Sequence, residues 1–352
     1  MTRTRTALRP IALPLALLLS PLLAACGDDP AGPGGDWPAA EETVEARGLV
    51  WAAGRTIHLG DGTTLDAGAP VRAFVVGRGG AFVVPDTRSE DETWPELVRV
   101  TPGGHEPLGV HAEPGSLSLS PDGRYLAFLD HSGERDDYGT PLAEAVVVDL
   151  DTGREVHRSA DGMGDTATDD LADLYEDAPP AVLGVSATHA YFLTPGEVIA
   201  VEISSGGSEV VSDVNSGYHD QPWYDALASE PVLTSPDGAW TIRQPPRGAP
   251  QLVPAAGGTA VTTRLTAADL GLDPLAPQPR DLDWSLDSWL DDATAAGIAT
   301  VSASVDGAQT FPLITCGAPD GACRVVPGTE DGALLPESRA GGGVVPTPLP
   351  SP

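Results

Sequence analysis

Residues 117–129 decide the fold of this chain, and their sequence is Leu-Ser-Leu-Ser-Pro-Asp-Gly-Arg-Tyr-Leu-Ala-Phe-Leu. The leucines at its start alternate with serines, which is the two-residue period of a half-buried β-strand. Residues 120–123, Ser-Pro-Asp-Gly, have the composition of a tight turn, because Pro fixes φ and Gly accepts a left-handed backbone. Residues 125–129 are a second apolar, β-prone run. The stretch therefore predicts a β-hairpin.

The hairpin recurs along the chain in two interleaved series. The first includes residues 235–242, Ser-Pro-Asp-Gly-Ala-Trp-Thr-Ile, with weaker copies at residues 77–84, 186–193 and 283–289. The second has Gly at its turns and spans residues 57–65, 100–108, 148–156, 201–210, 253–261 and 314–325. Two hairpins in each period of about 50 residues predict four antiparallel strands per repeat, which is the content of a β-propeller blade.

Six outer hairpins predict an all-β, six-bladed β-propeller over residues 43–338, with seven blades as the alternative. The first blade lacks a fourth strand at the N-terminal end. The run at residues 333–335, Ala-Leu-Leu, is expected to supply it. A propeller closed in this way by N- and C-terminal strands has no open sheet edge. Residues 284–297 are compatible with either a strand or a further insertion.

The repeat resembles the units of the TolB-like β-propeller family. That family carries the run Ser-Pro-Asp-Gly-Arg followed by aliphatic, Ala and Phe positions, found here at residues 120–128. It also carries Asp-Leu-Asp-Thr-Gly in the outer hairpin, found at residues 149–153. The resemblance covers most of residues 43–336, and one repeat matches strongly. It implies a propeller fold and no particular activity, because propellers have many functions.

The N-terminus predicts export and a lipid anchor. Residues 1–25 combine three arginines with an apolar run over residues 11–25, which is too short and too interrupted by Pro for a membrane span. The sequence Leu-Ala-Ala-Cys that ends at Cys26 resembles the lipobox of bacterial lipoproteins, which implies diacylation of Cys26. Ordinary signal cleavage beside an incidental cysteine is the alternative. Because two acyl chains anchor stably, we expect a protein on the extracytoplasmic face of the cell membrane.

Composition excludes one class of partner. The chain has 51 Asp and Glu against 19 Lys and Arg, which gives a net charge of −32. Such an acidic surface argues against nucleic acid and against electrostatic adhesion to anionic lipid. All of the basic residues are Arg, and this bias, together with 41 Gly and 35 Pro, is typical of a G+C-rich bacterial genome.

Two segments are predicted to lie outside the folded domain. Residues 26–42 are rich in Gly, Pro, Ala and Asp and show no apolar periodicity, so we expect a flexible tether. Residues 339–352 form a Gly- and Pro-rich tail for which we expect disorder.

Loop lengths indicate which face of the propeller carries the functional site. In a four-stranded antiparallel blade, the turns after the first and third strands share one face, and the other connections share the opposite face. The long insertions all belong to the second kind and span residues 85–96, 131–144, 159–180, 213–230 and 266–280. Because loops held by a rigid scaffold usually carry function, we expect the binding site on this face.

The densest aromatic cluster lies in the fourth insertion. Residues 216–225 have the sequence Ser-Gly-Tyr-His-Asp-Gln-Pro-Trp-Tyr-Asp, in a chain that is only 5% aromatic. Such rings suit a sugar, a peptide or a protein partner. The candidate binding residues are Tyr218, His219, Asp220, Trp223 and Tyr224. The alternative is that Trp223 and Tyr224 only pack the loop onto a blade.

Two further features have structural interpretations. Cys316 and Cys323 lie in one hairpin of an exported chain, which predicts a disulfide, with free thiols as the alternative. The acidic run at residues 161–177 lacks the spacing of an EF-hand loop, which favours a solvated charge run over a Ca²⁺ site. A short helix is expected over residues 169–175. We expect no metal or cofactor.

No catalytic motif appears, and the seven histidines are scattered singly, so no catalytic residue is assigned. We expect a monomeric binding or scaffolding module for an envelope protein, a small molecule or a glycan. The alternative is a hydrolase or lyase with its site in the propeller funnel. Two or more acids with a histidine lining that funnel would favour the enzyme.

Overall fold

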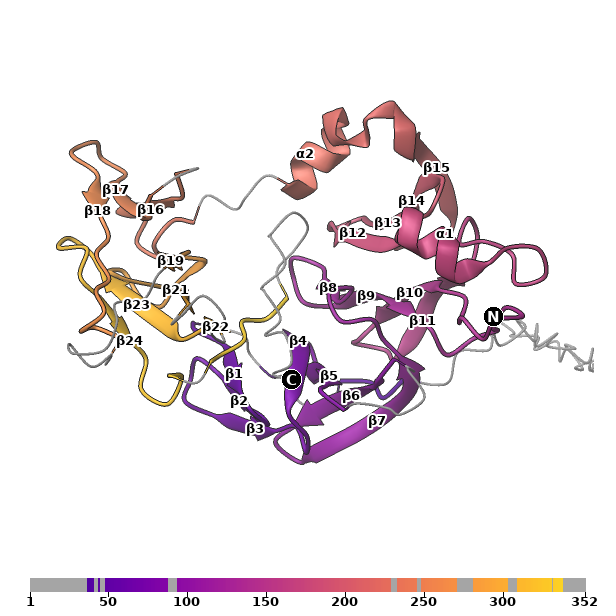
Figure 1. Ribbon diagram of the computed structural model, residues 1–352, viewed down its shortest axis with the longest axis horizontal. Coiled ribbons are helices and arrows are strands. Elements are labelled where there is room, and N and C mark those ends of the chain that lie inside the picture. The colour runs from indigo at the N-terminus through magenta and orange to yellow at the C-terminus, as the bar shows by residue number, and fades with distance from the viewer. Residues whose placement is uncertain are drawn as a thin grey trace, which may run out of the picture. The chain divides into compact units, whose positions relative to one another are not determined.

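The computed structural model describes residues 37–40, 44, 48–87, 94–228, 233–245, 248–270, 281–302, 309–330 and 332–337. The predicted signal peptide, Cys26 and the C-terminal tail lie outside these ranges. Within them, the strands pair antiparallel and form six sheets that follow one another along the chain (Figure 1).

The first three sheets occupy the N-terminal half. The first has the order β1–β2–β3, with β1 at Trp51–Ala53, β2 at Thr56–His58 and β3 at Thr64–Asp66. The second has the order β4–β5–β6–β7, with β4 at Val71–Gly77, β5 at Gly80–Pro85, β6 at Glu96–Thr101 and β7 at Gly104–His111. The third has the order β8–β9–β10–β11, with β8 at Ser118–Leu119, β9 at Tyr125–Asp130, β10 at Glu144–Asp149 and β11 at Arg154–Ser159.

The next two sheets follow in the same way. The fourth has the order β12–β13–β14–β15, with β12 at Ala181–Val185, β13 at His189–Leu193, β14 at Glu197–Glu202 and β15 at Ser208–Asp213. The fifth has the order β16–β17–β18, with β16 at Trp240–Arg243, β17 at Gln251–Pro254 and β18 at Val261–Thr262.

The sixth sheet and the helices complete the described elements. The main path is β19–β21–β23–β24, with β19 at Asp281–Trp284, β21 at Thr294–Ser302, β23 at Leu313–Gly317 and β24 at Cys323–Val325. The short strands β20 (Ser288–Trp289) and β22 (Gln309–Thr310) both pair with β21. The helices are α1 (Leu171–Asp177), η1 (Val214–Ser216), η2 (Tyr218–Asp220) and α2 (Pro222–Ala228). Among the described residues, no helix has the length and apolar character needed to cross a membrane.

Successive antiparallel sheets, three of them four-stranded among the described residues, make this an all-β protein with the fold of a β-propeller, as the sequence predicts. Each of the six predicted outer hairpins is present as a pair of neighbouring strands. The number of blades stays a prediction. Residues 284–297, which the sequence left open as a strand or an insertion, include the strand β20. This strand pairs with Ala295 and Ala296 of β21.

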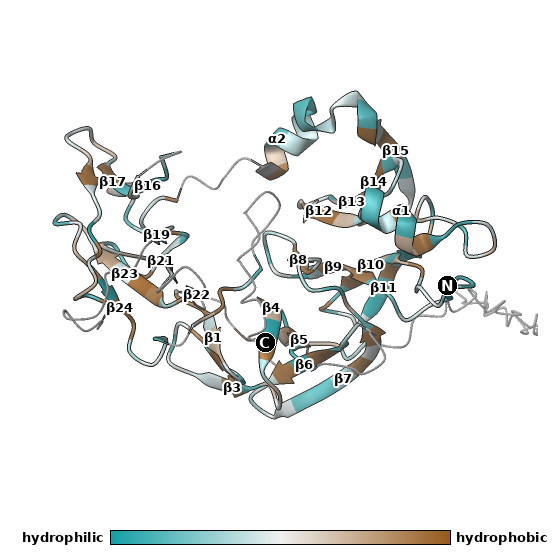
Figure 2. Ribbon diagram, in the orientation of Figure 1, coloured by the Kyte–Doolittle hydropathy of each residue, from teal (hydrophilic) through white to brown (hydrophobic). Residues whose placement is uncertain are grey.

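Neighbouring sheets bury their apolar side chains against each other. Separate hydrophobic clusters join the first sheet to the second, the second to the third, the third to the fourth and the fifth to the sixth. Within a sheet the inner strands are the most apolar. Figure 2 shows this in the second sheet, where β6 is largely brown and the mostly exposed outer strand β7 is largely teal. The hydrophobic effect therefore fixes which strands are inner and which are outer.

The two Ser-Pro-Asp-Gly turns have the same hydrogen bonds. In the first, the Ser120 hydroxyl donates to Asp122 at 2.6 Å and accepts from the Tyr125 backbone N–H at 2.9 Å. In the second, the Ser235 hydroxyl donates to Asp237 at 2.6 Å and accepts from the Trp240 N–H at 3.0 Å. The glycine of each turn has a positive φ, which a side chain would strain. This shared chemistry explains why the turn sequence repeats.

The first of these turns is tied to the outer hairpin of its own sheet. Arg124 donates two hydrogen bonds to the Asp149 carboxylate, at 3.0 and 2.8 Å. The pairing lowers the pKa of Asp149. Arg124 follows the Ser-Pro-Asp-Gly turn, and Asp149 begins the Asp-Leu-Asp-Thr-Gly run. The two motifs therefore act together in stabilising the blade.

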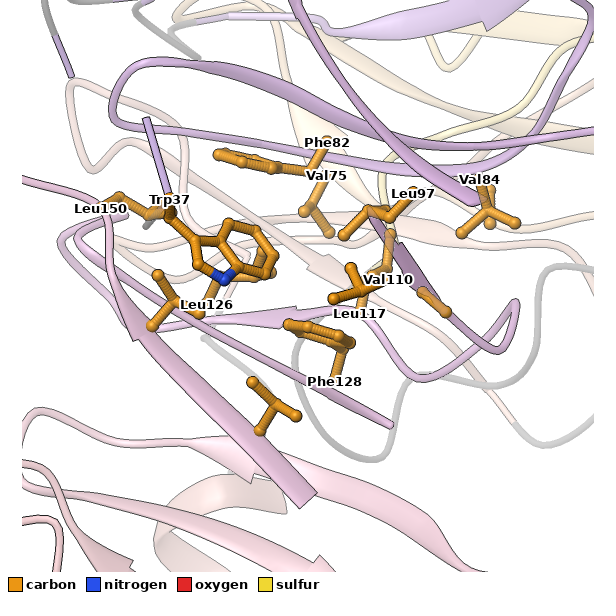
Figure 3. Packing of buried hydrophobic residues seen from close by; sticks show 14 residues of the cluster. Trp37, Val75, Phe82, Val84, Leu97, Val110, Leu117, Leu126, Phe128 and Leu150 are labelled. Atoms are coloured by element: carbon orange, nitrogen blue, oxygen red, sulfur yellow. The ribbon is translucent and has the colours of Figure 1, made fainter. Parts of the chain in front are cut away.

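Trp37 shows that the predicted tether does not extend over all of residues 26–42. Its side chain is buried with Phe82, Leu126, Phe128 and Leu150 between the second and third sheets (Figure 3). Its ring centroid lies 5.5 Å from that of Phe128. The described part of this segment, residues 37–40, is thus packed onto the propeller. The tether was predicted from the average composition of residues 26–42, and this average does not reveal that Trp37 alone has a large apolar surface to bury.

The backbone of the same segment lies directly on the outer turn at Gly153. The Trp37 N–H donates to the Gly153 carbonyl oxygen at 3.2 Å, and the Ala40 N–H donates to the Leu150 carbonyl at 3.0 Å. Gly153 has φ +68°, and a Cβ there would lie 2.0 Å from the Trp37 carbonyl oxygen. Glycine is required at this turn for its conformation and for the close approach of Trp37.

The C-terminal segment adds one β-bridge to the first sheet, at the residues where the sequence predicts a closing strand. Ala52 of β1 and Leu334 exchange both backbone hydrogen bonds, at 2.8 and 2.9 Å. The neighbouring Ala333 is buried in a cluster with residues of the sixth sheet and with Trp51. The pairing covers an edge of β1 that would otherwise have unpaired backbone groups.

Candidate functional site

Sheet topology places the long insertions as predicted. Residues 85–96 and 131–144 join the second and third strands of their sheets, and residues 159–180, 213–230 and 266–280 join one sheet to the next. Because strand direction alternates in an antiparallel sheet, both kinds of connection leave from the same end of the strands. Parts of the first, fourth and fifth insertions lie outside the described residues.

Three of these insertions meet around a pocket of about 330 Å³. The first insertion contributes Trp94, the second contributes His131 and the third contributes Tyr175 and Glu176. Glu113, from the link between β7 and β8, also lines the pocket. Side chains that lie up to about 80 positions apart in the sequence are thereby brought to one place. None of the five predicted binding residues lines this pocket.

His131 is the most deeply buried polar side chain of the pocket, with only 3% of its surface exposed. Its Nε2 lies 3.3 Å from a Glu113 carboxylate oxygen, and its ring centroid lies 5.2 Å from that of Trp94. Within the described part of the chain, its buried Nδ1 has no hydrogen-bond partner. A buried polar atom in this state is uncommon in a folded protein and marks a site of interest.

Trp94 is held in place through its backbone. The His111 Nδ1–H donates to the Trp94 carbonyl oxygen at 2.6 Å, and the His111 backbone N–H donates to Asp130 at 3.0 Å. Asp130 is fully buried and accepts a further hydrogen bond from Arg158 at 2.8 Å. Because Asp130 directly precedes His131, this network positions both rings of the pocket wall.

Arg158 is the centre of that network. Only 10% of its side chain is exposed, and it contacts Glu144 and Glu155 as well as Asp130. A buried charge is tolerated when it is paired and hydrogen-bonded in this way. Removing Arg158 would leave the carboxylate of the fully buried Asp130 without a charged partner beside the pocket.

Tyr175 presents its ring to the pocket while its hydroxyl is used elsewhere. The hydroxyl donates to the Met163 carbonyl oxygen at 2.8 Å and accepts from the Ala143 N–H at 3.0 Å. Burial raises the pKa of the phenol. The side chain therefore offers a ligand an aromatic surface, since its one proton is already donated.

Helix α1 carries Tyr175 and confirms the short helix expected in this insertion. Asp170 is its N-cap and accepts from the N–H groups of Ala172 and Asp173. Leu171 is fully buried, and its N–H donates to Asp136 of the second insertion at 2.9 Å. The second and third insertions are thus hydrogen-bonded to each other beside the pocket.

The aromatic loop predicted from the sequence forms a stack on the fourth sheet. The Trp223 ring lies 4.7 Å from the Tyr191 ring of β13 and is nearly parallel to it, at 7°. Tyr218 stacks beyond Trp223 at 6.4 Å, and Tyr224 meets both rings edge-on. This arrangement agrees with the packing alternative. A binding role for Tyr218, His219, Asp220, Trp223 and Tyr224 stays a prediction.

The predicted disulfide between Cys316 and Cys323 is present. These residues lie directly opposite each other on β23 and β24. Both side chains are buried in the cluster shared by the fifth and sixth sheets. The bridge therefore stabilises a hairpin and takes no part in the pocket.

The acidic third insertion uses several of its carboxylates within its own loop. Asp165 accepts from the Ala167 N–H and Asp169 accepts from the Asp165 N–H, both at 2.8 Å. In the described residues, no group of three or more His, Cys, Asp or Glu side chains is arranged to hold a metal ion.

Sequence reasoning missed Trp94, Glu113, His131 and Tyr175 as site residues. The sequence signal was weak, because four of the five long insertions carry an aromatic or imidazole side chain and nothing in the sequence shows which of them meet. Trp94 lies two residues before β6, and His131 directly follows β9. Rigid strand ends position such side chains best.

No protein-family model matches the sequence, and no curated protein matches it. Among solved structures, puromycin hydrolase is similar with 14% identity and a TM-score of 0.24, over 82% of this chain and 46% of that one. This chain thus spans less than half of that enzyme. The Swd1 β-propeller domain of Myceliophteria thermophila is similar with 13% identity and a TM-score of 0.23, over 81% of this chain and 99% of that one. These likenesses identify neither a family nor a function.

Proposed function

We propose that this chain is a lipid-anchored, extracytoplasmic propeller of the TolB-like repeat type that binds a small ligand in the pocket between its insertions. The convergence of Trp94, His131 and Tyr175 from three separate insertions carries the proposal. The lipobox sequence at Cys26 supports the anchor, and the turn sequence at residues 120–128 supports the repeat type.

The size and lining of the pocket favour a small molecule over a protein partner. Ligand pockets commonly have volumes of about 300–1,000 Å³, and this pocket lies near the lower limit. Its volume of about 330 Å³ is roughly that of ten water molecules at about 30 Å³ each. Aromatic rings and prolines form most of the wall, and a few polar groups are available to orient a ligand.

Hydrolysis is the second candidate function, and the His131–Glu113 pair favours it. A histidine held by a carboxylate is a common general base, which would accept a proton from water attacking the substrate. The described lining residues include two carboxylates and one imidazole, and no serine or cysteine is among them.

Ligand-observed NMR with a set of small amines, amino acids and monosaccharides tests the binding proposal. We expect at least one compound to bind the wild type, and its binding to be lost in Trp94→Ala. Tyr138→Ala is the matched control, because Tyr138 belongs to the second insertion and is 76% exposed. If every compound fails to bind, or if Trp94→Ala binds as well as the wild type, the proposed site is wrong.

The same assay separates binding from hydrolysis. A ligand that stays chemically unchanged over a day with the wild type supports a binding module. If the wild type converts the ligand, and His131→Gln still binds it but no longer converts it, the result supports the hydrolase.

A further inference from the structure

The charged groups that line the pocket are predominantly acidic. Among the described residues that line it, Glu113 and Glu176 contribute carboxylates and none is an arginine. Of the described lining side chains, His131 alone can carry positive charge, and its Nε2 is already paired with Glu113. A negatively charged ligand would face these carboxylates in a chain whose net charge is −32.

The described lining offers few free backbone N–H groups to an anion, and its neutral side-chain donors are the Trp94 indole N–H, the Thr140 hydroxyl and the Tyr175 hydroxyl. Pro141, Pro179 and Pro180 have no backbone N–H. The backbone N–H groups of Thr140 and Ala172 already donate to Asp136 and Asp170, respectively. The Tyr175 hydroxyl donates to Met163. Recognition of a carboxylate or phosphate requires several free donors, so an anion is a poor match to this lining.

Two aromatic side chains line the same space. The Trp94 ring is fixed against His131, and Tyr175 is fixed by its hydroxyl, which donates one hydrogen bond to Met163 and accepts one from Ala143. The faces of Trp and Tyr rings attract cations, most strongly where water is excluded. Aromatic rings combined with carboxylates and few donors are the chemistry that recognises an ammonium group.

We propose that the pocket selects a compact organic cation, with Trp94 and Tyr175 contacting the cationic group and Glu113 and Glu176 supplying the compensating charge. This inference rests on the proposed binding function and adds the chemical class of the ligand. A pocket of about 330 Å³ accommodates a substituted ammonium group with a short substituent.

Choline and 3,3-dimethylbutan-1-ol form a matched pair of probes, because they have nearly the same shape and differ in charge. We expect choline to bind the wild type at least about tenfold more tightly in isothermal titration calorimetry, a difference equivalent to about 1.4 kcal/mol. Glu176→Gln and Glu113→Gln should each weaken choline binding and leave the neutral alcohol unaffected. Glu176 is exposed, so its variant is expected to fold even if Glu113→Gln does not.

Glu134→Gln is the control for the carboxylate variants, because Glu134 belongs to the second insertion without lining the pocket. Equal affinity for choline and the alcohol would overturn cation selection and leave the binding site standing. Choline binding that is unaffected by both carboxylate variants would also overturn the inference. If choline fails while another compound binds in a Trp94-dependent manner, the inference fails alone. If no compound binds, the proposed function fails with it.

Discussion

The carboxylate of Glu337 accepts a hydrogen bond from the Leu117 backbone N–H at 2.9 Å, although 220 residues separate the two. Its other oxygen accepts from the Gly115 N–H, and the Glu337 backbone N–H donates to the Phe74 carbonyl oxygen. The end of the described chain is therefore fastened to the second sheet and to the link that precedes the third. The charge of Glu113, a pocket residue, also acts on Glu337.

The first prediction concerns the pH dependence that Glu337 gives to stability. Burial raises its pKa from 4.5 to about 7, against the opposing effect of the hydrogen bonds from Gly115 and Leu117. Because the folded-state pKa is raised, this stabilisation is complete below about pH 4.5 and is lost as the pH rises through about 7. The loss is on the order of 3 kcal/mol, since the pKa rises by about 2.5 units and one unit corresponds to about 1.4 kcal/mol.

Glu337→Gln cannot titrate and isolates this effect. We expect it to be less stable than the wild type at about pH 5, because its amide NH₂ cannot accept from a backbone N–H. The difference in melting temperature should narrow as the pH rises to about 8. If the melting temperatures of the two proteins change with pH in the same way, the raised pKa of Glu337 is contradicted.

The second prediction is that Trp37 belongs to the folded domain. Trp37→Ala should lower the free energy of unfolding by about 3–5 kcal/mol, because a large buried side chain leaves a cavity. Tyr138→Ala, at an exposed aromatic residue, should change it by less than about 0.5 kcal/mol. Guanidinium unfolding measures both. Equal guanidinium midpoints for the two variants would show that residues 37–40 belong to the flexible tether and not to the folded domain.

The third prediction concerns the Cys316–Cys323 bridge. Reduction should lower stability by about 2–3 kcal/mol, the value of the chain-entropy model for so short a loop. Urea midpoints with and without reductant measure this, and the double variant Cys316→Ala/Cys323→Ala should no longer respond to the reductant. Thiol labelling of either cysteine in the unreduced, folded protein would show that the bridge is absent.

The fourth prediction separates packing from binding in the aromatic loop. Trp223→Ala removes a ring stacked on Tyr191 and should lower the melting temperature, and Tyr224→Ala should lower it less. Choline binding should stay unchanged in both, because neither residue lines the pocket. If either variant folds but no longer binds choline, or no longer binds an envelope protein that the wild type captures, the aromatic loop is a binding site after all.

The fifth prediction concerns the anchor. Cys26→Ser should move the protein from the membrane fraction to the soluble fraction, because it removes the acceptor for the acyl chains. Fractionation followed by immunoblotting measures the distribution, with Cys316→Ser as the control for a general effect of cysteine loss. A Cys26→Ser protein that still sediments with membranes would exclude lipidation as the anchor.

The hairpins were predictable because their chemistry is local. The Ser120 and Ser235 turns each form their hydrogen bonds within six residues, so a short sequence contains all the information they need. The closing contribution of Leu334 followed from a missing strand, since an open sheet edge has to be paired or protected.

The pocket was not predictable in this way. Trp94, Glu113, His131 and Tyr175 come together only when the second and third sheets pack and α1 lies beside them. The sequence indicates which connections are long and not which of them meet. Trp37 was misassigned for a related reason, because its partners Phe82 and Phe128 belong to distant strands.

The pairing of Leu334 with Ala52 has a consequence for biosynthesis. The first sheet receives an edge partner from Leu334, which is synthesised only after all six described sheets. Until then, the outer backbone groups of β1 remain available to other extended chains. A chain that stops before residue 334 would keep this edge of β1 unpaired and able to bind other extended chains. Termination before residue 334 would therefore be expected to yield aggregates or protease substrates.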